Sequence, residues 1–241
     1  MVDGFKFGNR ATWDFSMRVE KYPRQSGAAR KFKEISVPGR NGALHIDEGC
    51  FENFQQPYEC YFHGVLPTPE QSHAIRAWLQ GTPGYQRLED VYDPEHFRMA
   101  SFTGPLDVEN HFNRYGRCVV TFDCMPQAFL KSGEIPISFV VPGLLYNSTG
   151  FPALPMITVY GSAAGTLTVG TCAVEIKSLE DVIILDSDTQ NAFRRSDAGA
   201  LENKNACIYA PTFPQLLPGA NVIAWDGGIE RVEIIPRWWT L

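Results

Sequence analysis

A turn rich in glycine and asparagine, residues 37–44 (VPGRNGAL), constrains the fold of this chain more than any other segment. It separates two short runs, residues 32–37 and 44–46, in which apolar residues are spaced among polar ones. Asn41 and Gly42 are of the residue types that most readily adopt positive φ, which a tight turn between antiparallel strands requires. The segment therefore predicts a β-hairpin, and with it a fold that contains antiparallel strands.

Alternation of apolar and polar residues, which is typical of half-buried strands, recurs along the rest of the chain. Residues 114–124 (RYGRCVVTFDC) are rich in β-branched and aromatic residues and predict a strand. After residue 155, short apolar runs follow at regular intervals, separated by turn residues and without a convincing helix: 156–160, 165–169, 173–176, 182–186, 221–225 and 229–235. This second half predicts an antiparallel β-sandwich.

One α-helix is marked by its start and stop signals, and we expect it at residues 69–80. Thr68 is placed to act as the N-cap, Pro69 to occupy the first helical position and Gln71 to complete a Thr-x-x-Gln capping box. Gly81 then supplies a residue that can end the helix in a left-handed conformation. Three apolar residues fall on one face of the helix: Ile75, Trp78 and Leu79. This narrow stripe predicts a helix that lies across a sheet and buries its tryptophan there.

At 241 residues, of which 44% are hydrophobic, the chain is long enough for two β domains with substantial cores. Proline, glycine and asparagine concentrate between residues 125 and 155, where charges are few, as in a connection between domains. We expect an N-terminal β-sandwich or barrel-like domain at residues 1–135, a connection at 136–155 and a C-terminal β-sandwich at 156–241. In this arrangement we expect that the extreme C-terminus can pack back on the first domain.

Charge and hydropathy narrow the function classes. The net charge of −6 and the pI near 5.4 argue against a dedicated nucleic-acid binder. Charges or prolines interrupt each apolar run, so we expect no membrane insertion, and the first residues lack a secretory signal. Residues 18–40 are locally basic. We interpret them as a solvated edge that charge protects from aggregation, with a surface for an acidic partner or for passing DNA as the alternative.

No catalytic or metal-binding constellation stands out in the sequence. The five histidines lack zinc-site spacings and the six cysteines lack a Cys-x-x-Cys motif, so we expect reduced, structural cysteines. Residues 89–95 include an acidic cluster that we interpret as a solvated loop and not as an acid/base pair. Asp186 and Asp188 lack the glycine and distal glutamate of an EF-hand calcium loop. We therefore expect no enzyme activity, no cofactor and no bound metal.

Several motifs occur in an order that resembles one viral protein family. The first half holds the hairpin turn, an aromatic segment at residues 49–62 and then the helix. The second half holds a proline-rich strand entry that ends in Tyr-Gly, a strand closed by aspartate, an FPxLxPGxNx(V/I) run and a final PRWW: residues 152–161, 182–187, 213–223 and 236–239. Together these segments resemble the distal tail proteins (Dit family) of long-tailed, siphovirus-type bacteriophages or prophages.

This resemblance implies a mainly β fold, with an N-terminal β domain that carries one helix and forms a hexameric ring, and a C-terminal galectin-like β-sandwich. It implies a structural hub of the tail tip or baseplate, which joins the tail tube protein to the tail-associated tip protein. The tape-measure protein and then DNA would pass through the central channel. The implied location is the tail tip of the virion, and the host cytoplasm during assembly.

The hairpin is the segment that we expect at or near the contacts between ring subunits. The candidate contact residues are Val37, Gly39, Arg40, Asn41, Gly42 and Leu44. The alternative function is a carbohydrate-binding module for host-surface glycans, because galectin-like sandwiches can hold sugars on one face. In that interpretation Trp238 and Trp239 stack on sugars; otherwise they pack against a neighbouring domain or subunit.

Overall fold

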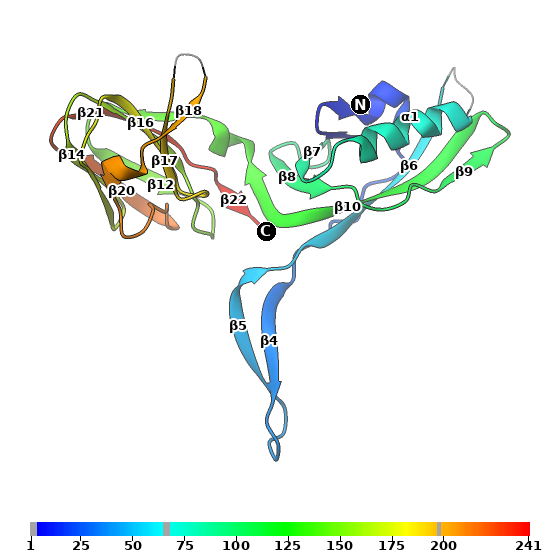
Figure 1. Ribbon diagram of the computed structural model, residues 1–241. Helices are drawn as coiled ribbons and strands as arrows, with labels where there is room; N and C mark the ends of the chain where they lie inside the picture. The colour runs from blue at the N-terminus through cyan, green and yellow to red at the C-terminus, as the bar shows by residue number, and fades with distance from the viewer. Residues whose placement is uncertain (1–3, 65–67, 197–198) are drawn as a thin grey trace. The chain divides into compact units, whose positions relative to one another are not determined.

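The computed structural model describes residues 4–64, 68–196 and 199–241 of the chain (Figure 1). Strands hold 53% of the residues, and the described part of the chain contains a single α-helix. The chain divides into two compact units, Met1–Ala128 and Phe129–Thr240, each with a hydrophobic core of its own. The expected fold class, mainly β with one short helix in the first half, is confirmed.

The first unit is built on one sheet with the strand order β2-β1-β7-β8-β10-β6-β3, and β9 also pairs with β10. Its strands are β1 (Phe5–Phe7), β2 (Arg10–Ala11), β3 (Met17–Val19), β6 (Phe54–His63), β7 (Gln86–Asp90), β8 (His96–Ser101), β9 (Val108–His111) and β10 (Tyr115–Leu130). A 3₁₀ helix, Thr12–Phe15, precedes β3. Two strands remain outside this sheet and pair with each other: β4 (Arg30–Ser36) and β5 (Ala43–Phe51).

The strand predicted at residues 114–124 is present as β10, which continues to Leu130. Its alternation turns one set of residues toward the core: Gly116, Cys118, Val120, Phe122 and Cys124. Gly116 pairs directly with Phe62 of β6, and a Cβ atom at position 116 would lie 2.4 Å from the Phe62 ring. Glycine is therefore required there, because it leaves the space that the buried phenyl ring occupies.

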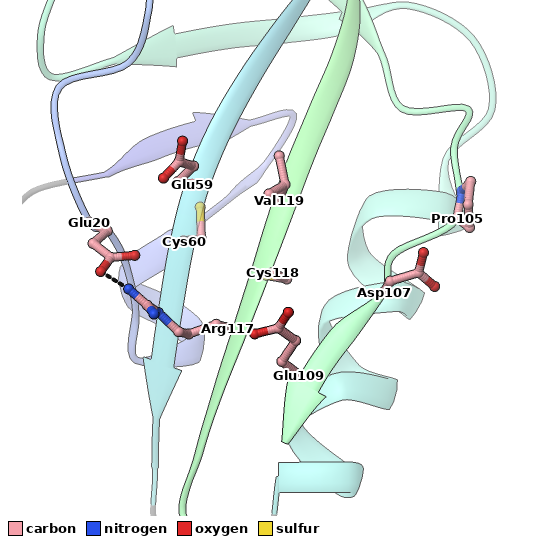
Figure 2. Close-up of a pocket in the computed structure, with 9 residues that line it drawn as sticks. All are labelled: Glu20, Glu59, Cys60, Pro105, Asp107, Glu109, Arg117, Cys118 and Val119. Atoms are coloured by element: carbon pink, nitrogen blue, oxygen red, sulfur yellow. Dashed lines mark hydrogen bonds and ion pairs between the residues drawn. The ribbon is translucent and has the colours of Figure 1, made fainter. Parts of the chain in front are cut away.

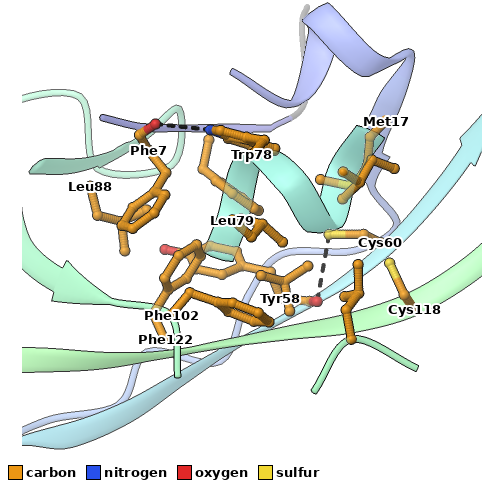
Figure 3. Packing of buried hydrophobic residues seen from close by; sticks show 14 of the residues in the cluster. Phe7, Met17, Tyr58, Cys60, Trp78, Leu79, Leu88, Phe102, Cys118 and Phe122 are labelled. Carbon is orange, nitrogen blue, oxygen red and sulfur yellow. Dashed lines mark hydrogen bonds between the residues drawn. The ribbon is translucent and has the colours of Figure 1, made fainter. Parts of the chain in front are cut away.

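The single α-helix, α1 (Thr68–Gly81), lies where the sequence predicts it and covers the core of the first unit (Figure 3). Its buried face carries the predicted stripe: Ile75, Trp78 and Leu79. The Trp78 indole Nε1 donates a hydrogen bond to the carbonyl oxygen of Phe7 at 3.1 Å. The same indole stacks on Phe15, with ring centroids 4.8 Å apart. The helix is thus held to the sheet by one large aromatic side chain whose polar atom is satisfied.

Both ends of α1 differ from the sequence prediction. The helix begins at Thr68, so this residue belongs to the first turn, and its Oγ1 finds no partner in the described chain. The capping box does not form, because Gln71 Nε2 donates to the carbonyl oxygen of Phe15 in the core instead. Gly81 is the last helical residue, and positive φ occurs later, at Gly84 (+83°).

The second unit contains two sheets, with the strand orders β11-β21-β13-β16-β17-β18 and β12-β20-β14-β15-β19. The strands of these sheets are β11 (Ile137–Phe139), β12 (Gly143–Asn147), β13 (Met156–Gly161), β14 (Gly165–Val169), β15 (Cys172–Ile176), β16 (Asp181–Asp186), β17 (Asn191–Arg195), β18 (Leu201–Asn203), β19 (Ile208–Tyr209), β20 (Gly219–Trp225) and β21 (Ile229–Ile235). A last short strand, β22 (Trp239–Thr240), belongs to neither of the two sheets. Buried side chains of both sheets, such as Val159 and Leu167, belong to one hydrophobic cluster. The second unit is therefore a β-sandwich.

Residues 136–155, which the sequence predicts to be a connection, contribute one strand to each sheet of this sandwich, namely β11 and β12. Leu145 of β12 lies in the hydrophobic core of the second unit. Pro142 directly precedes β12, where it ends the turn between the two strands. The dense turn residues of this segment thus separate short strands.

The end of the chain is fixed within the second unit. Arg237 has positive φ (+56°), and its Nη1 donates to Oδ1 of Asp186 at 2.6 Å. The backbone N–H of Arg237 donates to the carbonyl oxygen of Gly133 at 2.9 Å. A Cβ atom at Gly133 would lie 2.5 Å from the Trp238 nitrogen, and Trp238 itself is buried in the core. The segment that ends in two tryptophans is therefore an integral part of this sandwich.

Candidate assembly surface

The hairpin that the sequence predicts is formed by β4 and β5, which Figure 1 shows as a two-stranded ribbon. Its loop spans residues 37–42 and is longer than the expected tight turn. Positive φ occurs at Gly39 (+80°) and Gly42 (+79°), and Asn41 is not among the positive-φ residues. Two glycines, and not the Asn-Gly pair, therefore reverse the direction of the chain.

One face of this hairpin carries three exposed apolar side chains, which we call the apolar stripe: Ile35, Leu44 and Ile46. Cross-strand pairing defines it, since Ile35 lies directly opposite Leu44 and Lys33 directly opposite Ile46. Between 36% and 50% of each stripe residue is exposed. A cluster of neighbouring apolar side chains at this exposure is typical of a surface that another chain covers.

On the opposite face of the hairpin, the side chains contact one another. Phe32 stacks on His45 with ring centroids 4.6 Å apart and an interplanar angle of 11°. His45 Nε2 in turn lies 3.1 Å from Glu34 Oε1. Phe32, which the sequence places in one apolar run with Ile35, thus points to the other side, because the two positions differ by an odd number of residues.

Two ion pairs lie near the base of the hairpin. Arg30 Nε donates to Asp47 Oδ2 at 2.8 Å, and Lys31 Nζ lies 3.1 Å from Glu48 Oε2. The hydrogen bonds from Arg30 and from the backbone N–H of Gly49 lower the pKa of Asp47. Exposed pairs of this kind add little stability, and their main effect here is to occupy these charges within the hairpin.

The structure brings the predicted contact residues together at the tip of the hairpin. The loop holds five of them and β5 holds the last: Val37, Gly39, Arg40, Asn41, Gly42 and Leu44. All six are exposed. Ile35, Ile46 and Lys33 lie on the same hairpin outside these six candidates, and the apolar spacing on both sides of the turn was a sequence signal for the two isoleucines. Within the described chain, the charged side-chain groups of Lys33 and Arg40 have no hydrogen-bond or ion-pair partner, although the backbone N–H of Arg40 donates to the carbonyl oxygen of Val37.

A groove of about 450 Å³ is the second surface feature of the first unit (Figure 2). Its lining residues are Glu20, Glu59, Cys60, Pro105, Asp107, Glu109, Arg117, Cys118 and Val119. Four of these are carboxylates and one is an arginine, so the groove is acidic. Arg117 pairs with Glu20, and Lys21 Nζ lies 2.8 Å from Glu59 Oε1. Asp107 has no such partner within the part of the chain that the structure describes.

The acidic cluster at residues 89–95 supports a turn. Asp90 Oδ1 accepts hydrogen bonds from the backbone N–H groups of Tyr92 and Asp93, at 2.9 and 2.8 Å. Asp90 Oδ2 accepts the hydroxyl of buried Tyr58 at 2.8 Å, and burial together with this carboxylate raises the pKa of Tyr58. Across the described residues, no group of three or more His, Cys, Asp or Glu side chains is placed to hold a metal ion. No described helix is long and apolar enough to span a membrane.

Several aromatic side chains of the second unit contact other groups of the protein, whereas Tyr146 and Tyr209 are 68% and 58% exposed. The Arg231 guanidinium lies 4.0 Å from the ring centroid of Tyr160. Trp238 is buried, and Trp239 stacks on Phe151 with centroids 4.4 Å apart. The terminal tryptophans, which we expected against a neighbouring domain or subunit, thus pack against residues of their own unit.

The fold and the surface together define a mainly β protein of two units that presents an exposed, partly apolar hairpin. A crystal structure of the SPP1 Dit (gp 19.1) protein, described as a paradigm of the hub adsorption apparatus in phages that infect Gram-positive bacteria, has a similar fold. The TM-score is 0.74 and the match covers 99% of both chains, at 9% sequence identity. Neither a protein-family profile nor a curated protein sequence matches the chain. The resemblance to distal tail proteins is therefore confirmed at the level of the fold.

Proposed function

We propose that this protein is a structural hub of a phage tail tip and not an enzyme. The observation that carries the proposal is the fold shared with the SPP1 Dit protein over 99% of both chains. β-sandwiches by themselves serve many functions, but this match extends over both units and their order in the chain. In the proposed assembly, the hub joins the tail tube protein to the tail-associated tip protein, after assembly in the host cytoplasm.

The proposed hub is a hexameric ring whose central channel passes the tape-measure protein and then DNA. Heterologous contacts that close by rotation generate such a ring from one pair of surfaces. We assign one of these surfaces to the hairpin, because a lone two-stranded ribbon is marginally stable in water and gains stability when its apolar face is covered. The contact candidates are those at its tip: Val37, Gly39, Arg40, Asn41, Gly42 and Leu44.

The test is the mass of the purified chain, measured by multi-angle light scattering, followed by negative-stain imaging. We expect a species of about six times the 27.0 kDa of the monomer, with a central hole in class averages. The same measurement on the chain co-expressed with the neighbouring tube and tip proteins serves as the second arm. A monomer in both arms would contradict the proposal.

A further inference from the structure

We propose that the apolar stripe of one copy's hairpin docks against the acidic groove of a second copy. The inference rests on the proposed ring and names the surface that receives the hairpin. Both surfaces belong to the first unit, so a single contact repeated around a ring uses each of them once per copy. The stripe and the groove match in two respects, apolar contact and charge.

The hairpin offers apolar side chains bordered by unpaired positive charge. Lys33 lies directly opposite Ile46, on the face of the stripe, and Arg40 lies in the loop. Neither cation has a partner within the described chain, whereas Arg30 and Lys31 are paired inside the hairpin. When the stripe is covered, Lys33 loses part of its water and is stabilised only by an anion on the covering surface.

The groove offers the complementary combination. Val119 of β10 is 51% exposed and provides apolar surface. Asp107 is unpaired among the described residues. The Glu109 carboxylate lies 3.8 Å from the Nε2 atom of His111, which is too far for a hydrogen bond. Glu59 on β6 lies directly opposite Val119, and Glu109 on β9 lies opposite Arg117, two positions along β10, so strands on both sides of β10 bring a carboxylate to the same groove. Docking of the stripe on Val119 then brings Lys33 to carboxylates that the chain itself leaves available.

Charge reversal with rescue tests this pairing. We expect Lys33→Glu and Asp107→Lys each to raise the dissociation constant of the ring by about tenfold or more, because like charges then meet at the contact. The double variant restores opposite charges, and we expect it to regain most of the ring. Lys6→Glu is the matched control, since Lys6 is an exposed lysine of β1 with no partner in the described chain. Circular dichroism of each variant checks that it is folded.

Cross-linking of the wild-type chain with a carbodiimide tests the contact directly. This reagent joins a lysine to a nearby carboxylate without a spacer. In a mixture of ordinary and ¹⁵N-labelled protein, we expect mixed-isotope peptides that link Lys33 to Asp107 or Glu109. Rings that persist unchanged in both single variants, without this cross-link, would overturn the inference and leave the proposed hub intact. Absence of any ring from the wild-type chain, with and without tail partners, would overturn both.

Discussion

Arg237 and Asp186 show how one pair of residues fixes the end of a chain. The guanidinium of Arg237 contacts both carboxylate oxygens of Asp186, at 2.6 and 3.3 Å. Burial alone would raise the pKa of Asp186, but the hydrogen bonds and charge of Arg237 outweigh it, and the pKa is lowered. A carboxyl group with a lowered pKa stabilises the fold above its unfolded-state pKa, and this contribution is lost as the pH falls through its folded-state pKa.

We expect Asp186→Asn to lower the free energy of unfolding of the second unit by about 2 kcal/mol at neutral pH, because it removes the acceptor charge of Arg237. The difference from the wild-type chain should begin to shrink as the pH falls below about 4, the ordinary pKa of an aspartate, and should be lost as the pH falls through the lowered folded-state pKa of Asp186. Urea unfolding at a series of pH values measures this. Asp188→Asn, at an exposed neighbour, is the control. A difference that does not change with pH would contradict the assigned role.

The cysteines provide a second test at the scale of the residue. Burial raises the pKa of Cys118 and Cys124 to about 12, and burial with nearby Cys118 raises that of Cys60. Cys50, which we expected to be reduced and structural like the others, is exposed on β5. Since the thiolate is the reactive form, maleimide at neutral pH should modify Cys50 and spare the three buried thiols until the protein is unfolded. Peptide mass spectrometry with and without urea reads the result; equal labelling of Cys60 and Cys50 in the folded chain would refute it.

The pairing of β6 with β10 depends on one close approach. We expect Gly116→Ala to destabilise the first unit by about 1–3 kcal/mol, because the new methyl group would overlap the buried Phe62 ring. Addition of Phe62→Leu should return part of this loss by making room. Thermal unfolding of the single and double variants measures both effects. Gly27→Ala, where nothing lies within 4 Å of the new Cβ, should change little.

The helix and the hairpin could be predicted from the sequence because their signals were local. Details that depend on a residue far away in the sequence could not be predicted. Turn chemistry located the hairpin, and the apolar stripe of α1 located the helix. The capping box failed because the Gln71 amide reaches the Phe15 carbonyl, a partner 56 residues away that no local pattern reveals. The groove could not be predicted, since its carboxylates come from three separate segments, with Glu20 and Glu109 far apart in sequence. The hairpin tip was predictable, whereas the membership of Ile35 in the stripe needed the strand register.

At the scale of the whole molecule, the two hydrophobic clusters share no residue, so each unit has a stability of its own. We expect Trp78→Ala to lower the free energy of unfolding of the first unit by about 3–5 kcal/mol, because it empties a core site and removes the hydrogen bond to Phe7. Differential scanning calorimetry should show two transitions, of which one shifts to lower temperature and the other keeps its temperature. Leu167→Ala, in the other core, should move the opposite transition. If both transitions move together in each variant, the units do not unfold independently.

Each core encloses one tryptophan, Trp78 in the first unit and Trp238 in the second, whereas Trp13 is 47% exposed. An indole shielded from water emits at shorter wavelength than a hydrated one, so the protein carries a built-in optical reporter for each half. Variants that keep only one of the two enclosed indoles, with Trp13, Trp225 and Trp239 also replaced, would let the melting of each half be followed separately by its emission wavelength.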